Sequence, residues 1–167
     1  MAGLIHLIRH AEPTLTGVML GRLDPPLASD DHRPIALDAA SVFCSPLTRA
    51  RRTAELYFPG REILCLPGLA EISLGEWDGL AWSQIEAGWP RLAREKLRDW
   101  FNVTPPGGER WSDFEARVAG AWQRIRESRL PCAIVAHSGV NSVLARLAAG
   151  REISGQQYGE VLTLEIL

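Results

Sequence analysis

Short apolar runs and longer stretches of helical periodicity alternate along the chain. The runs at 4–8, 41–44 and 132–136 are mostly apolar, which is typical of strands buried on both faces of a parallel sheet. Weaker strands are predicted at 63–66 and 161–167. Between the strands, apolar side chains recur every three to four residues, which indicates amphipathic helices. These helices are predicted at 47–57, 81–87, 90–101, 112–128 and 140–149.

Polar residues and glycine mark the ends of several predicted helices. Ser45 followed by Pro46 is expected to cap the first helix, because serine accepts from backbone N–H groups and proline suits the first turn. Ser112 and Glu115 have the spacing of a capping box for the long helix. Gly150 is expected to close the helix that begins near residue 140.

The order of these elements predicts the fold class. Strands that alternate with helices indicate an α/β fold, here a three-layer α/β/α arrangement around a mainly parallel central sheet. The chain has 167 residues, which is the length of one domain, and 46% of them are hydrophobic, which suffices for one core. We therefore expect a single domain over 1–167, with a helical insertion that faces the substrate at about 77–111.

Charge and cysteine content narrow the classes of partner. The net charge is -2 and both signs are scattered along the chain, so no footprint for nucleic acid is expected. No apolar run approaches the ~20 residues that cross a bilayer, so no membrane partner is expected. The three cysteines form no Cys-x-x-Cys pair, and the N-terminus lacks the pattern of a signal peptide. A reducing, cytoplasmic location is the expectation.

Titratable or phosphate-binding groups follow each of the three buried strands. Ligands of such sheets bind at the carboxyl ends of the strands. A single histidine after a strand is usually structural, but three strand ends of this kind predict a site at one edge of the sheet. The residues are Arg9 and His10 after the first strand, Ser45 and Arg49 after the second, and His137, Ser138 and Gly139 after the third.

Arg49 gives a second indication of an anion. It falls in the first turn of its predicted helix, where the positive end of the helix dipole disfavours a cation. A bound phosphate would remove that conflict. The alternative is that Arg49 extends into solvent, as Arg51 and Arg52 are expected to do.

Six segments resemble, in order, the motifs of the histidine phosphatase superfamily, also called phosphoglycerate-mutase-like. Together they span nearly the whole chain, and jointly they are far more specific than Arg-His alone. The segments are 7–12, which contains the Arg-His box, 21–27, 44–54 with its Ser-x-Leu-x-Arg-Ala pattern, 69–79 with Leu-x-Glu, 106–109 with Pro-Gly-Gly-Glu, and 135–139 with the second histidine.

The resemblance implies a role for each motif residue. His10 would be the nucleophile and form a phosphohistidine, Arg9, Arg49 and His137 would hold the phosphoryl oxygens, and Glu71 would donate the proton. Flanking guanidinium groups disfavour the imidazolium, which keeps the attacking nitrogen free. Such a cationic pocket stabilises phosphoryl transfer without a metal, so no cofactor and no metal are expected.

Several assignments have alternatives. The carboxylates of Glu12, Glu76 and Glu109 lie in neighbouring motifs and compete with Glu71 for the role of acid, although position in the Leu-x-Glu motif favours Glu71. The two other histidines are expected to be structural or exposed. Ser138 is expected to bind the substrate phosphate together with the residues named above. Secondary candidates for this contact are Thr16, Gly21, Arg22 and Glu109.

The chain departs from the family pattern in two places. Members usually carry Thr and Asn where this chain has Pro13 and Thr16, which removes one expected phosphate contact. The segment 28–41 is short and lacks the start of the family's first helix. One flank of the sheet would then be covered thinly, or by the second subunit of a homodimer.

The leading hypothesis is hydrolysis of a small phosphorylated metabolite. The resemblance is greatest to α-ribazole-phosphate phosphatases of cobalamin assembly, with a phosphoglycerate-type mutase and a protein phosphohistidine phosphatase as alternatives. The tryptophans Trp82, Trp89 and Trp100 would overhang the pocket and select the substrate, or would only pack the helices there. From other classes, a metal-dependent hydrolase and a non-catalytic phosphate-binding regulatory module remain as alternatives.

Overall fold

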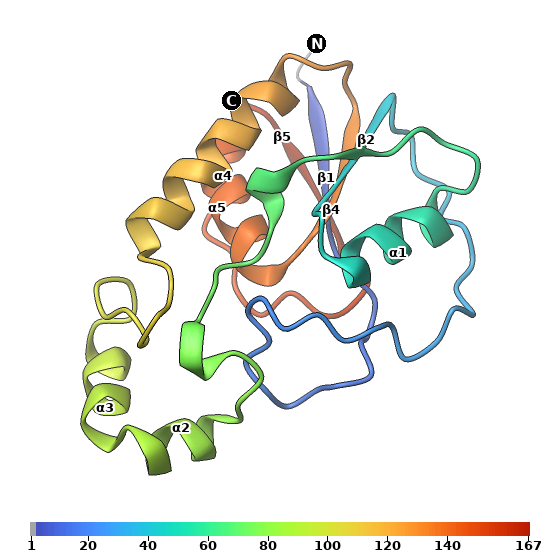
Figure 1. Ribbon diagram of the computed structural model, residues 1–167. Helices are drawn as coiled ribbons and strands as arrows, with labels where there is room; N and C mark the ends of the chain where they lie inside the picture. The colour runs from blue at the N-terminus through green and yellow to red at the C-terminus, as the bar shows by residue number, and fades with distance from the viewer. Residues whose placement is uncertain (1–2) are drawn as a thin grey trace.

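A computed structural model describes residues 3–167 and shows an α/β fold around a five-stranded sheet (Figure 1). The strands lie in the order β3-β2-β4-β1-β5. Their bounds are β1 Leu4–Arg9, β2 Ser41–Cys44, β3 Leu64–Cys65, β4 Cys132–Ala136 and β5 Val161–Glu165; the helices are α1 Thr48–Tyr57, α2 Trp82–Gly88, α3 Pro90–Arg98, α4 Trp111–Arg126 and α5 Ser138–Ala149, with short 3-10 helices at Pro67–Leu69 and Gly75–Trp77.

The sheet is parallel except for its last strand. Arg9 at the end of β1 pairs with Ala136 at the end of β4, and Cys44 at the end of β2 pairs with Val135. Strand β5 runs antiparallel to β1. The carboxyl ends of β1, β2 and β4 therefore lie at one edge of the sheet, and the residues that follow these strands lie close together.

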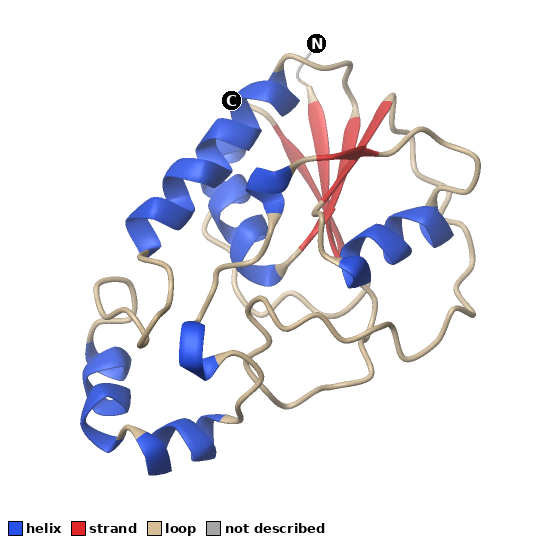
Figure 2. Cartoon of the chain, viewed as in Figure 1, coloured by secondary structure: helices blue, strands red, loops and turns tan. Residues whose placement is uncertain are grey.

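Helices cover both faces of the sheet (Figure 2). Helices α4 and α5 lie on one face and bury the larger core cluster, which includes Phe114 and Leu144. Helix α1 lies on the other face, over a smaller cluster that includes Val42 and Val135. Helices α2 and α3 lie away from the sheet and pack on a separate cluster around Trp77.

The predicted cap at Ser45 is wrong. Helix α1 begins at Thr48, and its N-cap residue is Leu47, which makes no side-chain cap bond. The Ser45 hydroxyl lies 2.7 Å from His137 Nε2 and accepts from the Leu47 N–H at 3.2 Å. The Ser45 hydroxyl, which the local sequence predicted as the helix cap, therefore contacts His137 instead.

The predicted capping box is also wrong, because the long helix starts earlier. Helix α4 begins at Trp111 with Arg110 as its N-cap, so Ser112 is already inside the helix. The ring of Trp111 packs 5.0 Å from that of Phe114, which extends the apolar face by one turn.

Two strands are shorter than predicted. The strand at 63–66 is reduced to Leu64–Cys65, an exposed edge strand whose one neighbour is β2. The last strand ends at Glu165, which pairs with Leu4, the first residue of β1. Helix α5 starts two residues before the predicted position, at Ser138, and Gly150 closes it in the left-handed conformation, as predicted.

The segment 12–40 forms neither a helix nor a named strand. Its ordered contacts include isolated bridges from Pro13 to Leu27 and from Met19 to Leu80. Ile35, Leu37 and Ala39 pack against the cluster beneath α1. This irregular segment thus lies on the flank of the sheet that was expected to lack the family's first helix. Within residues 3–167, no helix is long and apolar enough to span a bilayer.

Candidate active site

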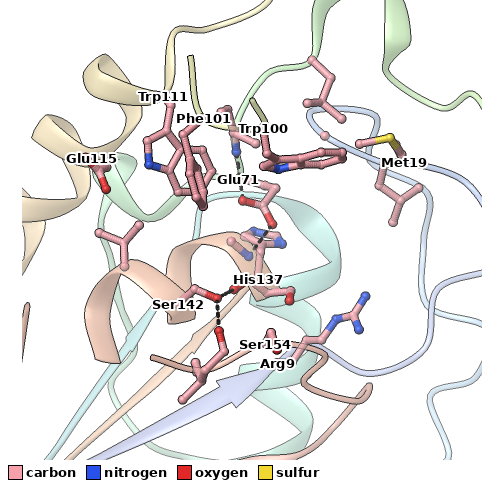
Figure 3. Close-up of a pocket in the computed structure, with 18 of the residues that line it drawn as sticks. Arg9, Met19, Glu71, Trp100, Phe101, Trp111, Glu115, His137, Ser142 and Ser154 are labelled. Carbon is pink, nitrogen blue, oxygen red and sulfur yellow. Dashed lines mark hydrogen bonds between the residues drawn. The ribbon is translucent and has the colours of Figure 1, made fainter. Parts of the chain in front are cut away.

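Residues from β1, α1 and α5 meet at the carboxyl edge of the sheet. The ring centroids of His10 and His137 lie 5.2 Å apart, and Arg49 Nε lies 3.3 Å from His10 Nε2. Arg9, His10, Arg49 and His137 line one cavity of about 1030 Å³ (Figure 3). The structure therefore brings together the residues that follow the three buried strands.

The hydrogen bonds of His10 show which ring nitrogen carries the proton. His10 is 2% exposed, and its Nδ1 lies 2.8 Å from the backbone oxygen of Ala11, which can only accept. Nδ1 must therefore carry the proton, and Nε2 keeps its lone pair toward Arg49. Burial lowers the pKa of His10 to about 3, and the positive charges of Arg49 and Arg9 act in the same direction. The imidazole is neutral at physiological pH.

Arg49 is held from several sides. Its Nη1 donates to the Leu23 oxygen at 2.8 Å and pairs with Asp24 at 3.1 Å, and its Nη2 donates to the Gly21 oxygen at 3.0 Å. The Asp24 carboxylate also accepts from the Thr48 N–H at 2.6 Å, at the start of α1. The anion that the sequence suggested at this helix end is thus supplied in part by Asp24. Asp24 lies in the motif segment 21–27, but no role was predicted for it.

Arg9 is placed by the loop that precedes β5. Its Nη1 donates to the backbone oxygen of Gln156 at 2.6 Å, and its guanidinium lies 4.0 Å from the ring centroid of Tyr158. The Tyr158 ring also lies 5.6 Å from that of His10. Sequence reasoning missed Gln156 and Tyr158, because this loop has neither a periodic pattern nor a motif.

His137 is buried and neutral. Burial lowers its pKa well below the ordinary value, and the neighbouring His10, Arg49 and Arg9 act in the same direction. Its Nε2 is held by Ser45 Oγ, while its Nδ1 has no hydrogen-bond partner in the described part of the chain. A buried polar atom in this state is available to a ligand oxygen.

Glu71 is the carboxylate that faces this cavity beside the histidines (Figure 3). It accepts from the N–H groups of Ile72 at 3.0 Å and of Gly139 at 3.1 Å. Burial nevertheless raises its pKa, which favours the protonated form. Of the competing carboxylates, Glu12 and Glu76 are exposed and lie outside the cavity lining.

Glu109 has a different place from the one predicted. Its carboxylate forms a two-bond ion pair with Arg117, at 2.7 and 2.9 Å, and does not line the cavity. Arg117 in turn donates to the backbone oxygens of Gly68, Ala70 and Glu71. Arg117 therefore links Glu109 to the segment that carries Glu71. Because the charge of Glu109 is already matched by Arg117, its role is to support that segment.

The remaining candidates for phosphate contact differ in their places. Ser138 and the secondary candidate Gly21 line the cavity. Thr16 is exposed and lies outside the lining. Arg22 is also exposed, and its Nε donates to the backbone oxygen of Glu71 at 2.5 Å.

The remaining histidines lie apart from the cavity lining. His6 Nδ1 lies 2.8 Å from Thr163 Oγ1 on the neighbouring strand, and His32 packs 6.0 Å from the Tyr57 ring. Residues 3–167 contain no group of three or more His, Cys, Asp or Glu side chains placed to hold a metal ion.

Comparison with known proteins gives matches over nearly the full length. The model of the histidine phosphatase superfamily (branch 1) matches residues 5–166. The adenosylcobalamin/alpha-ribazole phosphatase of Salmonella typhimurium is 32% identical over 161 residues, covering 84% of this chain and 77% of that protein. A 2,3-bisphosphoglycerate-dependent phosphoglycerate mutase of Methylobacterium radiotolerans is 29% identical over 179 residues, covering 97% and 76%.

Solved structures show the same architecture. The alpha-ribazole phosphatase from Shigella flexneri superposes with a TM-score of 0.81 at 23% identity, covering 98% of this chain and 94% of that chain. A phosphoglycerate mutase from Thermus thermophilus superposes with a TM-score of 0.76 at 28% identity, covering 98% and 96%.

Proposed function

The chain belongs to the histidine phosphatase superfamily, and from that premise we propose that it hydrolyses a small-molecule phosphomonoester through a phosphohistidine on His10. Phosphatase activity is common to the family description and to the first relative, and the chain is an enzyme of that type. The observation that carries the proposal is the neutral His10, whose Nε2 lone pair faces the Arg49 guanidinium.

The first step forms the phosphohistidine. His10 Nε2 attacks phosphorus, a P–N bond forms, and the P–O bond to the leaving group breaks. The guanidinium groups of Arg9 and Arg49 and the free Nδ1 of His137 bind the phosphoryl oxygens and stabilise their charge. Glu71, whose raised pKa favours the protonated form, gives its proton to the leaving oxygen.

The second step releases phosphate and restores the enzyme. The Glu71 carboxylate takes a proton from water, and the water oxygen attacks phosphorus. The P–N bond breaks, its electron pair returns to His10 Nε2, and inorganic phosphate leaves. The same carboxyl group thus acts as acid in one step and as base in the next.

Replacement of the nucleophile tests this proposal. His10→Ala should lose p-nitrophenyl phosphate hydrolysis by at least about 1000-fold, because no other imidazole in residues 3–167 is placed in the same way. His32→Ala is the control, since His32 lies outside the cavity lining. A His10→Ala enzyme at the wild-type rate would contradict the proposal.

The same assay separates the functions from other classes. Full activity after EDTA treatment supports the metal-independent mechanism, whereas loss that returns with added metal favours a metal-dependent hydrolase. A wild-type protein that binds phosphate but releases no p-nitrophenol above buffer would be a regulatory module.

The names of the relatives suggest two substrate classes. Alpha-ribazole phosphate is the first candidate, because the relative from Salmonella typhimurium is called an adenosylcobalamin/alpha-ribazole phosphatase. Phosphoglycerate is the second, because other relatives are called mutases. Release of inorganic phosphate in an amount equal to the ester consumed supports hydrolysis. Conversion of 3-phosphoglycerate to 2-phosphoglycerate without such release supports a mutase.

A further inference from the structure

The cavity extends well beyond the residues that handle phosphate. Its volume of about 1030 Å³ is at the upper end of the range for sites that hold whole drug-sized ligands, far more than one phosphoryl group requires. The end away from Arg9 is lined by Trp100 and Phe101, from the segment that joins α3 to α4, and by Trp111, the first residue of α4 (Figure 3). We call these three side chains the aromatic wall.

Most of the other tryptophans are used for packing. Trp77 is fully buried, and the rings of Trp82 and Trp89 lie 6.0 and 6.2 Å from it in the cluster of α2 and α3. The Trp100 ring lies 6.0 Å from that of Trp82, yet Trp100 keeps 38% of its surface exposed. Phe101 is 56% exposed, and both side chains line the cavity. Flat apolar surface left open inside a cavity indicates that a ligand covers it.

The aromatic wall is held in place by the core. The Phe101 ring packs 4.7 Å from Trp111, which packs 5.0 Å from the buried Phe114. Lys96, which also lines the cavity, is 4% exposed, and its ammonium lies 4.8 Å from the centroid of the Trp100 ring. The ammonium donates to the backbone oxygens of Trp100 and, at 2.7 Å, of Val103. The rings are therefore placed before any ligand arrives, which lowers the entropic cost of stacking.

The position of Glu71 indicates how a substrate would lie in the cavity. In Figure 3, Glu71 lies between the aromatic wall and the end of the cavity where Arg9 and His137 lie. Because Glu71 gives its proton to the leaving oxygen in the proposed reaction, the part of the substrate beyond that oxygen extends toward Trp100 and Phe101.

We propose that the aromatic wall binds a flat aromatic ring in the leaving group of the substrate. The inference rests on the proposed function and deepens it: the preferred substrate is a phosphomonoester whose leaving group carries an aromatic ring system. Stacking of a ring on aromatic side chains contributes about 1–3 kcal/mol per ring, a factor of about 5 to 150 in affinity.

Two esters with the same reacting centre test this inference. In 2-(1-naphthyl)ethyl phosphate and n-butyl phosphate, the leaving group is a primary alkoxide, so their intrinsic reactivity is similar. Wild-type enzyme should prefer the naphthyl ester by about 10-fold or more in kcat/KM. Both esters are measured on the same sample, so the ratio does not depend on the fraction of enzyme that is folded.

Substitution of the rings should lower this ratio. Trp100→Leu and Phe101→Leu keep apolar volume but remove the flat face, and each should lower the ratio by about 5-fold or more. Leu97→Ala is the control: Leu97 is 60% exposed on α3, lies outside the cavity lining, and should leave the ratio unchanged.

The results separate this inference from the function on which it rests. Equal turnover of the two esters by wild type, or a ratio unchanged in both ring variants, would overturn the inference while hydrolysis through His10 stands. Failure of wild type to hydrolyse either ester or p-nitrophenyl phosphate would overturn the proposed function, and the inference with it.

Discussion

At the scale of single residues, the chemistry depends on where protons lie. His10 is buried and Glu71 is partly buried, and loss of hydration shifts their pKa values in opposite directions. Each shift favours the neutral form, which the proposed first step uses: a free imidazole as nucleophile and a carboxylic acid as proton donor.

Replacement of the acid should discriminate between leaving groups. We expect Glu71→Gln to slow alkyl phosphates by about 100-fold or more and p-nitrophenyl phosphate by much less, because nitrophenolate leaves without a proton. The measurement is kcat/KM for both esters, with the exposed Glu76→Gln as control. Equal slowing of the two esters would count against Glu71 as the acid.

The low pKa of His10 also predicts how stability depends on pH. As pH falls below 6.5, the unfolded chain binds a proton on this ring, while the folded ring stays neutral until about pH 3. The folded state therefore loses stability as pH falls, by about 2 kcal/mol per such histidine between pH 7 and pH 5.

Urea unfolding of the wild type and of His10→Asn at pH 7 and pH 5 measures this loss. The variant should lose about 2 kcal/mol less than the wild type over that interval. The same pH dependence in both proteins would show that the His10 ring titrates normally in the fold.

A glycine next to Glu71 controls the position of its carboxylate. A Cβ at Gly139 would lie 2.6 Å from Glu71 Oε1, so Gly139→Ala should displace the carboxylate and lower kcat for alkyl phosphates by about 10-fold or more. At Gly120 in α4 a Cβ would have no neighbour within 4 Å, so Gly120→Ala should stabilise the helix by up to about 1 kcal/mol and leave kcat unchanged. Full activity of Gly139→Ala on alkyl esters would argue against this placement of Glu71.

At the scale of elements, Arg117 on helix α4 holds the segment that carries Glu71, the proposed acid. Arg117 joins Glu109 to the backbone of the segment before Glu71, so the Pro-Gly-Gly-Glu motif acts through position rather than through contact with substrate. The motif was visible in the sequence, but this role was not, because it depends on a partner on another element.

Loss of Arg117 should therefore affect both stability and rate. Arg117→Ala removes the charge partner of Glu109 and the donor to the backbone oxygens of Gly68 and Ala70, and should cost about 2 kcal/mol or more. It should also lower kcat on alkyl esters, because the Glu71 segment loosens. Arg91→Ala is the control: Arg91 is 89% exposed in its pair with Glu95, and its loss should cost less than about 0.5 kcal/mol. Equal effects of the two substitutions would contradict the supporting role of Arg117.

Elements were predicted well where local pattern decides them. The strands 41–44 and 132–136 have the predicted bounds, because complete burial leaves a continuous apolar run. The predicted cap at Ser45 failed because the hydroxyl makes a tertiary contact with His137. The predicted cap at Ser112 failed because the helix already begins at Trp111, whose ring packs on Phe114 one turn later. The edge strand β3 was overestimated, since an apolar run does not reveal how many neighbours a strand has.

At the scale of the whole molecule, topology places the site. Strands β1, β2 and β4 are distant in sequence but adjacent in the sheet, so their carboxyl ends bring Arg9, His10, Arg49 and His137 together. The coincidence of polar groups at three strand ends predicted this edge before the strand order was known. The order itself is not encoded in the hydrophobic pattern.

Other parts of the site come from irregular segments. Asp24 lies in the segment 12–40, inside the motif 21–27 but with no predicted role, and Tyr158 lies in the loop before β5, where no motif was found. Both reach the site through long-range packing, which the sequence does not display. The tryptophans at 77–111 were predicted as one group; the structure places Trp100 and Trp111 in the cavity lining and Trp77, Trp82 and Trp89 in the cluster of α2 and α3, with the Trp82 ring 6.0 Å from that of Trp100.

The central claim is that His10 carries the phosphoryl group, and trapping that intermediate tests it most directly. Wild-type enzyme mixed with a ³²P-labelled phosphomonoester and quenched in alkali within milliseconds should retain label on a single peptide. Mass spectrometry should then place the phosphoryl group on the His10 ring. Label on any other residue, or turnover with no label retained on the protein at any time, would contradict the account.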